Sequence, residues 1–434
     1  MTARPLTLAP LAAIVFFNVS GGPYGIEDMV PSFGPGLTLL LLVLTPLVWS
    51  LPVTLAMAEL ASAMPDEGGY VVWVERAFGR FWSFQVGWWS WIDSFIDVAI
   101  YPALFVEYLR FWLPAMTPGQ RWLAALAFIA VLTGLNVVGV RPAGRAAIAL
   151  AIAALVPAAL LVLAGLPSLS AAAWTPLLAP GRSLGAGLGL GLAVVMWNYS
   201  GWDTASTCLG ETAAPERAFR RALLVALPVI TAAYVVPMAV ALGSAAAPWT
   251  AWKTGFLPTV AERIGGRGLG ALVALGAVVS TAGLFLSLLL TNSRLPFVLA
   301  RQGQLPAALG RVHRRFATPW VAVVVSAACY GALAAFSFRE LIVLNVWLYS
   351  LTILVELAAF LRLRLAAPAL ARPWRVPGGA AVAWVVTVVP CALALLAMST
   401  AGWWNTVAGV LAALTGPAIY AAWRPRAAAP GCPR

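Results

Sequence analysis

Charge and histidine are scarce in this sequence. Only 10% of its 434 residues are charged, whereas a soluble domain carries about a quarter. With a single histidine, His313, neither a His-ligated metal site nor a His-based catalytic triad is expected. The four cysteines, Cys208, Cys329, Cys391 and Cys432, lack the spacing of metal ligands, and three of them fall in apolar segments. We therefore expect no metal, no cofactor and no hydrolytic enzyme.

The sequence contains many long apolar runs. Hydrophobic residues make up 62% of the chain, and many runs reach the length of about twenty residues that crosses a bilayer as a helix. The runs are continuous, whereas a transmembrane β-barrel has short alternating segments. The sequence predicts an all-α polytopic membrane protein with about twelve spans, at residues 8–34, 36–62, 80–113, 120–138, 146–166, 185–210, 222–245, 268–293, 319–336, 340–363, 380–398 and 402–422.

The net charge of +12 is spread unevenly over the two ends of these spans. With the N-terminus inside, about twenty Lys and Arg residues fall on the inner side and seven on the outer side. This bias indicates a multi-pass cell-membrane protein, in a plasma or inner membrane, with both termini cytoplasmic. It also explains the charge without a nucleic-acid partner. We expect a short amphipathic cytoplasmic helix within residues 64–80 and a Pro- and Arg-rich linker over residues 365–379.

Polar and flexible residues interrupt two of the expected spans. The stretch SGGPYGIED at 20–28 and the stretch WNYSGWD at 197–203 each place glycine beside a carboxylate within an apolar run. Interrupted helices about five spans apart predict an inverted-repeat transporter whose site lies at the membrane midplane. The alternative is a pair of kinked helices that bind nothing. The repeats would occupy residues 1–166 and 167–364, and residues 365–434 would form the linker and two peripheral spans.

Acidic side chains fall inside the expected spans, where an ionised carboxylate costs about 2.5 kcal/mol or more. They are Glu27, Asp28, Glu59, Asp93, Asp97, Asp203 and Glu356. No Lys or His falls within an expected span, and Arg145 and Arg294 lie near inner ends, where their side chains can extend to the interface. The acids therefore predict a positively charged substrate, a coupling proton, or both.

Asp93 and Asp97 stand four residues apart, so one face of a helix carries both of them. Trp89 and Tyr101 extend that face, and aromatic ring faces attract cations. This stripe suits an extended organic cation. The alternative is an aromatic packing face with two acids in a vestibule. An intramembrane aspartyl enzyme is disfavoured, because its two acids usually come from different helices.

A string of motifs carries a family resemblance. The stretches are SGGPYGIED (20–28), AELASAMPDEGGYVVWV (58–74), FWSFQVGWWSWID (81–93), IDVAIYP (96–102), WNYSGWDTASTCLGE (197–211), FATPWVAVVVSA (316–327) and RPWRVPGG (372–379). Over essentially its full length the chain resembles the amino acid–polyamine–organocation superfamily of secondary transporters. It looks closest to the polyamine-uptake branch, which is related to the L-type amino acid transporters. The resemblance implies a LeuT-like fold of two inverted five-helix repeats, with helices 1 and 6 broken, plus two further helices.

The residues and the resemblance together give the expected substrate site. Its members are Gly21, Gly22, Pro23, Tyr24, Glu27, Asp28, Asp93, Asp97, Tyr101, Trp197, Tyr199, Ser200, Trp202, Asp203 and Tyr349. Candidates for coupling or gating are Glu59, Glu356, Ser280 and Thr281. Asp93 departs from the pattern of the polyamine branch. Hydroxyls such as Ser280 and Thr281 could serve a sodium site, but in membrane helices they usually bond to backbone carbonyls.

We expect a secondary active transporter that works by alternating access within the lipid bilayer. The favoured substrate is a polyamine or another organic cation taken up by the cell, with a proton as the candidate coupling ion. The alternative is a permease or exchanger of neutral or cationic amino acids.

Overall fold

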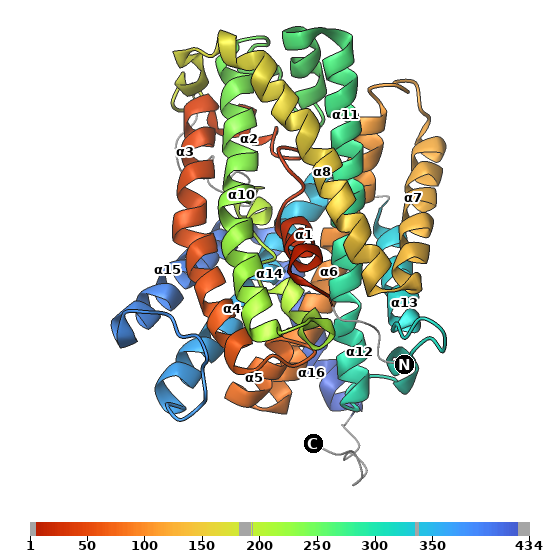
Figure 1. Ribbon diagram of the computed structural model, residues 1–434, viewed down its shortest axis with the longest axis vertical. Helices are drawn as coiled ribbons and strands as arrows, with labels where there is room; N and C mark the ends of the chain where they lie inside the picture. The colour runs from red at the N-terminus through yellow and green to blue at the C-terminus, as the bar shows by residue number, and fades with distance from the viewer. Residues whose placement is uncertain (1–5, 182–191, 193, 335–337, 424–434) are drawn as a thin grey trace.

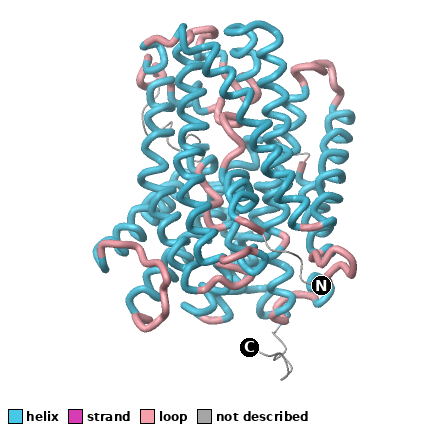
Figure 2. The backbone as a smooth tube through the Cα atoms, viewed as in Figure 1, coloured by secondary structure: helices cyan, strands magenta, loops and turns pink. Residues whose placement is uncertain are grey.

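The computed structural model describes residues 6–181, 192, 194–334 and 338–423. Within these ranges the regular elements are helices, and one isolated bridge joins Leu6 to Thr212. Long helices run side by side along the longest axis of the molecule, and the connections gather at the two ends of the bundle (Figures 1 and 2). The prediction of an all-α membrane protein is confirmed.

The α-helices follow the apolar runs of the sequence. They are α1 (Leu8–Val19), α2 (Met29–Phe33), α3 (Pro35–Thr45), α4 (Leu51–Ala63), α5 (Tyr70–Phe78), α6 (Arg80–Leu109), α7 (Pro118–Val138), α8 (Val140–Gly165), α10 (Pro215–Gly243), α11 (Leu257–Asn292), α12 (Arg294–Arg301), α13 (Trp320–Leu333), α14 (Phe338–Ala366), α15 (Gly379–Thr400) and α16 (Trp403–Trp423). A π-helical turn, η1 (Pro46–Ser50), joins α3 to α4. Five 3₁₀ segments complete the described helices: η2 (Leu166–Ser168), η3 (Ala171–Trp174), η4 (Thr204–Glu211), η5 (Trp249–Ala251) and η6 (Ala307–Gly310).

Eight helical stretches in the described residues are long and apolar enough to cross a membrane, and α1 and α13 are shorter apolar helices. Of the long stretches, the one that combines α11 and α12 is the most enclosed by protein, whereas α16 is the most exposed. The exposed apolar side chains of α16 suit contact with lipid tails. Helix α11 therefore lies inside the bundle, and α16 lies at its periphery.

The first predicted interruption is present. Helix α1 ends at Val19, residues 20–28 are not helical, and α2 begins at Met29. Gly22 and Gly25 have φ angles of 97° and 85°, which only glycine adopts at little cost. The glycines are thus needed for the backbone path of the break.

The second predicted interruption lies opposite the first. Regular helix stops at Asn198, and η4 begins at Thr204. Between them, Gly201 has a φ of 92°, and a Cβ atom added there would lie 2.2 Å from the carbonyl oxygen of Asn18. The absent side chain of Gly201 therefore lets the two breaks touch. Residues 182–191 and 193, in the first half of this predicted span, lie outside the described residues.

The short helix and the linker that the sequence predicts between spans are also present. Helix α5 lies within residues 64–80, at the same end of the bundle as α12 (Figure 1). It is amphipathic, but its first residues are more enclosed than a surface helix requires, since Tyr70 and Val71 are at most 1% exposed. Residues 367–378 form the non-helical linker between α14 and α15.

Gly201→Ala should lower the melting temperature of the purified protein and abolish the transport activity that the sequence predicts. The added methyl group would meet the Asn18 carbonyl and occupy a left-handed backbone conformation that costs a residue with a side chain about 1–2 kcal/mol. Gly79→Ala is the matched control, because Gly79 has a φ of 87° but no atom within 4 Å of an added Cβ. Thermal melting in detergent and uptake in proteoliposomes measure both. Equal losses in the two variants would contradict the proposed contact between the breaks.

Candidate functional site

A cavity lies where the two breaks face α6. Three carboxylates line it: Asp93 and Asp97 from α6, and Asp203 from the residue before η4. Among the described residues, no Lys, Arg or His side chain lines this cavity. We call it the carboxylate cavity. Its walls offer negative charge to a ligand and no positive charge of their own.

Neutral side chains from α14 hold two of these carboxylates. Asn345 donates from Nδ2 to Oδ1 of Asp93 over 3.1 Å. The Tyr349 hydroxyl donates to Oδ1 of Asp203 over 2.6 Å and accepts from the Gly201 N–H over 2.9 Å. These donors fix the direction of each carboxylate but do not neutralise it. Tyr349 also ties α14 to the second break through both of its hydrogen bonds.

Asp97 is held by two aromatic side chains. Trp197 donates from Nε1 to Oδ1 of Asp97 over 2.8 Å, and the Tyr101 hydroxyl donates to the same oxygen over 3.4 Å. The Tyr101 and Trp197 rings stack, with centroids 6.0 Å apart and planes 22° from parallel. This pair brings a flat aromatic wall next to a carboxylate, which suits an ammonium group and the methylene chain attached to it.

The same aromatic pair borders a second cavity. Val19, Tyr101 and Trp197 line both cavities. The second cavity lies beside the first break and has no acidic or basic side chain among its described lining residues. The Tyr101–Trp197 pair therefore stands between a charged compartment and a neutral one.

Hydroxyl groups of the second cavity bond to the backbone. Ser280 donates to the Gly21 carbonyl over 2.6 Å, and Thr281 donates to the Val278 carbonyl over 2.8 Å. The first of these bonds connects α11 to the break after α1. Both hydroxyls thus follow the backbone bonding expected of membrane helices.

The structure brings together only part of the expected site. Asp93, Asp97, Tyr101, Trp197, Ser200, Asp203 and Tyr349 line the carboxylate cavity. Gly21, Tyr24, Ser280 and Thr281 line the second cavity, as do Tyr101 and Trp197. Gly22, Pro23, Glu27, Asp28, Glu59, Tyr199, Trp202 and Glu356 line neither of the two.

The adjacent acids of the first break hold the chain instead of facing the cavities. Glu27 accepts from the Tyr108 hydroxyl and from the Gly25 N–H, each over 2.9 Å. Asp28 accepts a hydrogen bond from the Thr254 hydroxyl. These bonds join the first break to α6 and to the segment that follows α10. The carboxylates of Glu27 and Asp28 therefore position the part of the break that precedes α2.

Several lining residues escaped the sequence interpretation, among them Asn18, Tyr70, Ser90, Asn292 and Asn345. Asn18 comes just before the glycine break, and Asn345 stands one helical turn before Tyr349, so both positions carried a usable signal. Tyr70 carried no such signal, because its segment was predicted to be a helix on the cytoplasmic surface.

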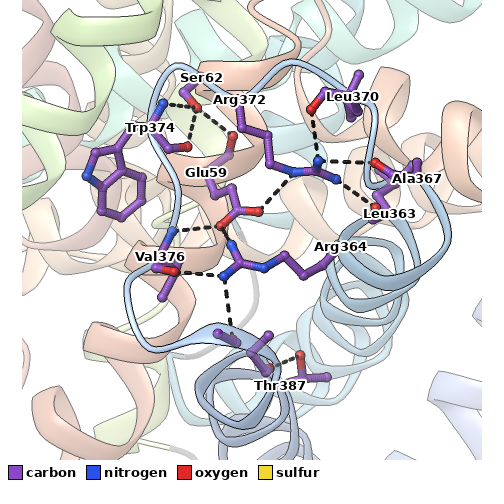
Figure 3. Close-up of polar contacts among 12 residues, drawn as sticks. Glu59, Ser62, Leu363, Arg364, Ala367, Leu370, Arg372, Trp374, Val376 and Thr387 are labelled. Carbon is purple, nitrogen blue, oxygen red and sulfur yellow. Dashed lines mark hydrogen bonds and ion pairs between the residues drawn. The ribbon is translucent and has the colours of Figure 1, made fainter.

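Glu59 lies in a different environment from the cavity acids (Figure 3). Its carboxylate forms ion pairs with Arg364 and, over 3.1 Å, with Arg372, and it accepts from the Val376 N–H over 2.8 Å. Arg364 also donates to the Val376 carbonyl over 2.8 Å. The cluster fastens the linker between α14 and α15 to the end of α4. Burial lowers the pKa of Arg372, and Glu59 acts in the opposite direction.

The expectation that the buried acids lack resident cations is therefore wrong for Glu59. Arg364 lies within α14 and is buried, although the sequence pattern placed it outside the span. The expectation that Arg294 extends to the interface is wrong as well. Its side chain is 1% exposed, and its Nε donates to Glu211 over 2.9 Å. A nearby carboxylate made burial of each arginine possible.

Comparison with known proteins matches residues 8–423 to the family of amino acid permeases. Polyamine transporter RMV1 of Arabidopsis thaliana is 34% identical over 391 residues, which cover 90% of this chain and 79% of that protein. Polyamine transporter PUT1 of Oryza sativa subsp. japonica is 35% identical over 402 residues, which cover 92% and 75%. The serine/threonine exchanger SteT of Bacillus subtilis (strain 168) is 26% identical over 280 residues, 62% of each chain. These matches identify the chain as a member of the amino acid permease family, within the superfamily of amino acid, polyamine and organocation transporters, and hence as a transporter and not an enzyme.

Proposed function

We propose that this transporter takes up polyamines or related linear organic cations. The observation that carries the proposal is the carboxylate cavity, where Asp93, Asp97 and Asp203 face one space without a cationic side chain among the described lining residues. Relatives whose names describe polyamine transport support it.

In this proposal each carboxylate binds one ammonium group. Asp93 and Asp97 are one helical turn apart, a rise of about 6 Å at 1.5 Å per residue. Asp203 approaches from the opposite break. An amine with several charges separated by methylene groups would neutralise these carboxylates, and its chain would lie against the Tyr101 and Trp197 rings. The attraction is strong because the site is shielded from bulk water.

In the proposed alternating-access mechanism, the carboxylates that bind the cation belong to two different repeats. Asp97 belongs to the first proposed repeat, residues 1–166, and Asp203 to the second, residues 167–364. A bound cation would draw the two repeats together around the touching breaks. The Tyr101–Trp197 pair, which borders both cavities, would control passage between them. Residues 365–434 would remain outside this movement.

Glu356 is the proposed carrier of a coupling proton. It is 0% exposed, and neither carboxylate oxygen has a hydrogen-bond partner among the described residues. An ionised carboxylate in such surroundings would be strongly disfavoured, so the protonated form is expected there. Glu356 stands two helical turns beyond Tyr349, whose hydroxyl donates to Asp203. Cation binding at Asp203 would thus alter the affinity of Glu356 for its proton.

The neutral second cavity favours one alternative, transport of amino acids. An amino acid could place its carboxylate and amine against the unwound backbone near Gly21, with Ser280 and Thr281 beside it. Competition against radiolabelled spermidine uptake by putrescine, leucine, serine and lysine separates the alternatives. We place the protein in the cell membrane with both termini in the cytoplasm, on the basis of the Arg distribution.

Asp97→Asn and Asp203→Asn should each reduce spermidine uptake by about tenfold or more, because each removes a charged partner whose hydrogen bond is worth about 1.5–3 kcal/mol. Radiolabelled uptake in proteoliposomes measures the loss, and the melting temperature verifies that each variant is folded. Asp66→Asn is the control, since Asp66 is exposed and does not line the cavity. Normal uptake in both cavity variants would remove the proposed cation site.

Glu356→Gln should abolish the acceleration of uptake by an inward proton gradient, because glutamine keeps the shape of the side chain but cannot release a proton. Exchange of labelled for unlabelled spermidine without a gradient should persist. Glu107→Gln, at a partly exposed ion pair with Arg110, is the matched control. A Glu356→Gln variant that still responds to the proton gradient would exclude this residue as the proton carrier.

A further inference from the structure

The side-chain amide of Asn18 is a buried polar group that no described residue hydrogen-bonds. Asn18 lies in the last turn of α1 and lines the carboxylate cavity. Its side chain is 5% exposed, and neither Oδ1 nor Nδ2 has a hydrogen-bond partner among the described residues. Of the described lining residues, Asn18 alone has two such atoms.

The surroundings hold Asn18 in place. Its carbonyl oxygen lies against Gly201, so close that a Cβ atom there would be 2.2 Å away. The Tyr234 hydroxyl donates to the neighbouring Val19 carbonyl over 3.5 Å and to the Asn198 carbonyl over 3.0 Å. A buried amide with no partner is costly, and this one is fixed at the junction of the two breaks. A ligand in the cavity is therefore the available partner.

The chemistry of the cavity restricts that partner. The carboxylates accept hydrogen bonds, and Asn345, Trp197 and Tyr349 already donate to them. An ammonium group can donate to Oδ1 of Asn18 but has nothing to accept from Nδ2. A ligand carboxylate would accept from Nδ2, yet the three Asp side chains would repel it. A neutral carbonyl or hydroxyl oxygen satisfies Nδ2 without that repulsion.

We propose that Asn18 forms a subsite for a neutral oxygen on an amine ligand, so that the transporter also accepts N-acylated polyamines. The inference rests on the proposed polyamine function. The N–H of the Asn18 amide donates to the acyl carbonyl oxygen, while the remaining ammonium groups bind the carboxylates. The chemical class of ligand is a linear amine with one amide or hydroxyl group.

The test compares the dissociation constants of spermidine and N1-acetylspermidine by calorimetry on the purified full-length transporter. Asn18→Leu keeps the size of the side chain and removes the donor, so the ratio of the acetylated to the unmodified dissociation constant should rise about five- to tenfold. Asn18→Asp replaces the donor with charge. It should strengthen spermidine binding and weaken N1-acetylspermidine binding, an opposite pair of shifts that general damage to the fold cannot produce.

Asn405→Leu on α16 is the matched control, and its ratio should equal that of the wild type. An unchanged ratio in both Asn18 variants would overturn the subsite, as would a wild-type protein that binds spermidine but not N1-acetylspermidine. A wild-type protein that binds neither amine would instead contradict the polyamine function itself. The two failures are therefore distinguishable.

Discussion

Negative charge buried without a resident cation is the constraint on which the proposed transport site depends. Asp93, Asp97 and Asp203 are held by amide, indole and hydroxyl groups, which orient carboxylates but leave their charge in place. Such an arrangement is unfavourable in a membrane unless a cation or a proton completes it. Around these carboxylates lie the two unwound breaks, the stacked Tyr101–Trp197 pair and Tyr349.

The same fold buries other acids in a different way. Glu59 has two arginine partners and a backbone N–H, so its charge is already matched by the protein. Its carboxylate joins α4 to the linker after α14 and leaves no capacity for a visiting cation. Glu27 is committed to Tyr108 and Gly25. Glu59 therefore differs from the proposed ligand-binding acids by its arginine partners, and Glu27 differs from them by its position outside the two cavities.

Local features of the sequence predicted the breaks and much of the carboxylate cavity. The glycines Gly22, Gly25 and Gly201 within apolar runs predicted backbone conformations that favour glycine. The four-residue spacing of Asp93 and Asp97 predicted that both lie on one face of a helix. Partners distant in sequence could not be predicted in this way. Arg364 lies 305 residues after Glu59, and only the packed fold shows that they meet. Tyr70 was missed because the hydrophobic pattern of α5 does not reveal that its first turn reaches the cavity.

The most direct measurement of the central claim is an experimental structure of the transporter in a lipid nanodisc with spermidine. The cation-site account predicts ligand nitrogen atoms within about 2.7–3.2 Å of carboxylate oxygens of Asp97 and Asp203, with the methylene chain against Trp197 and Tyr101. Spermidine bound only in the neutral second cavity, or carboxylates paired with protein cations in the bound state, would contradict it.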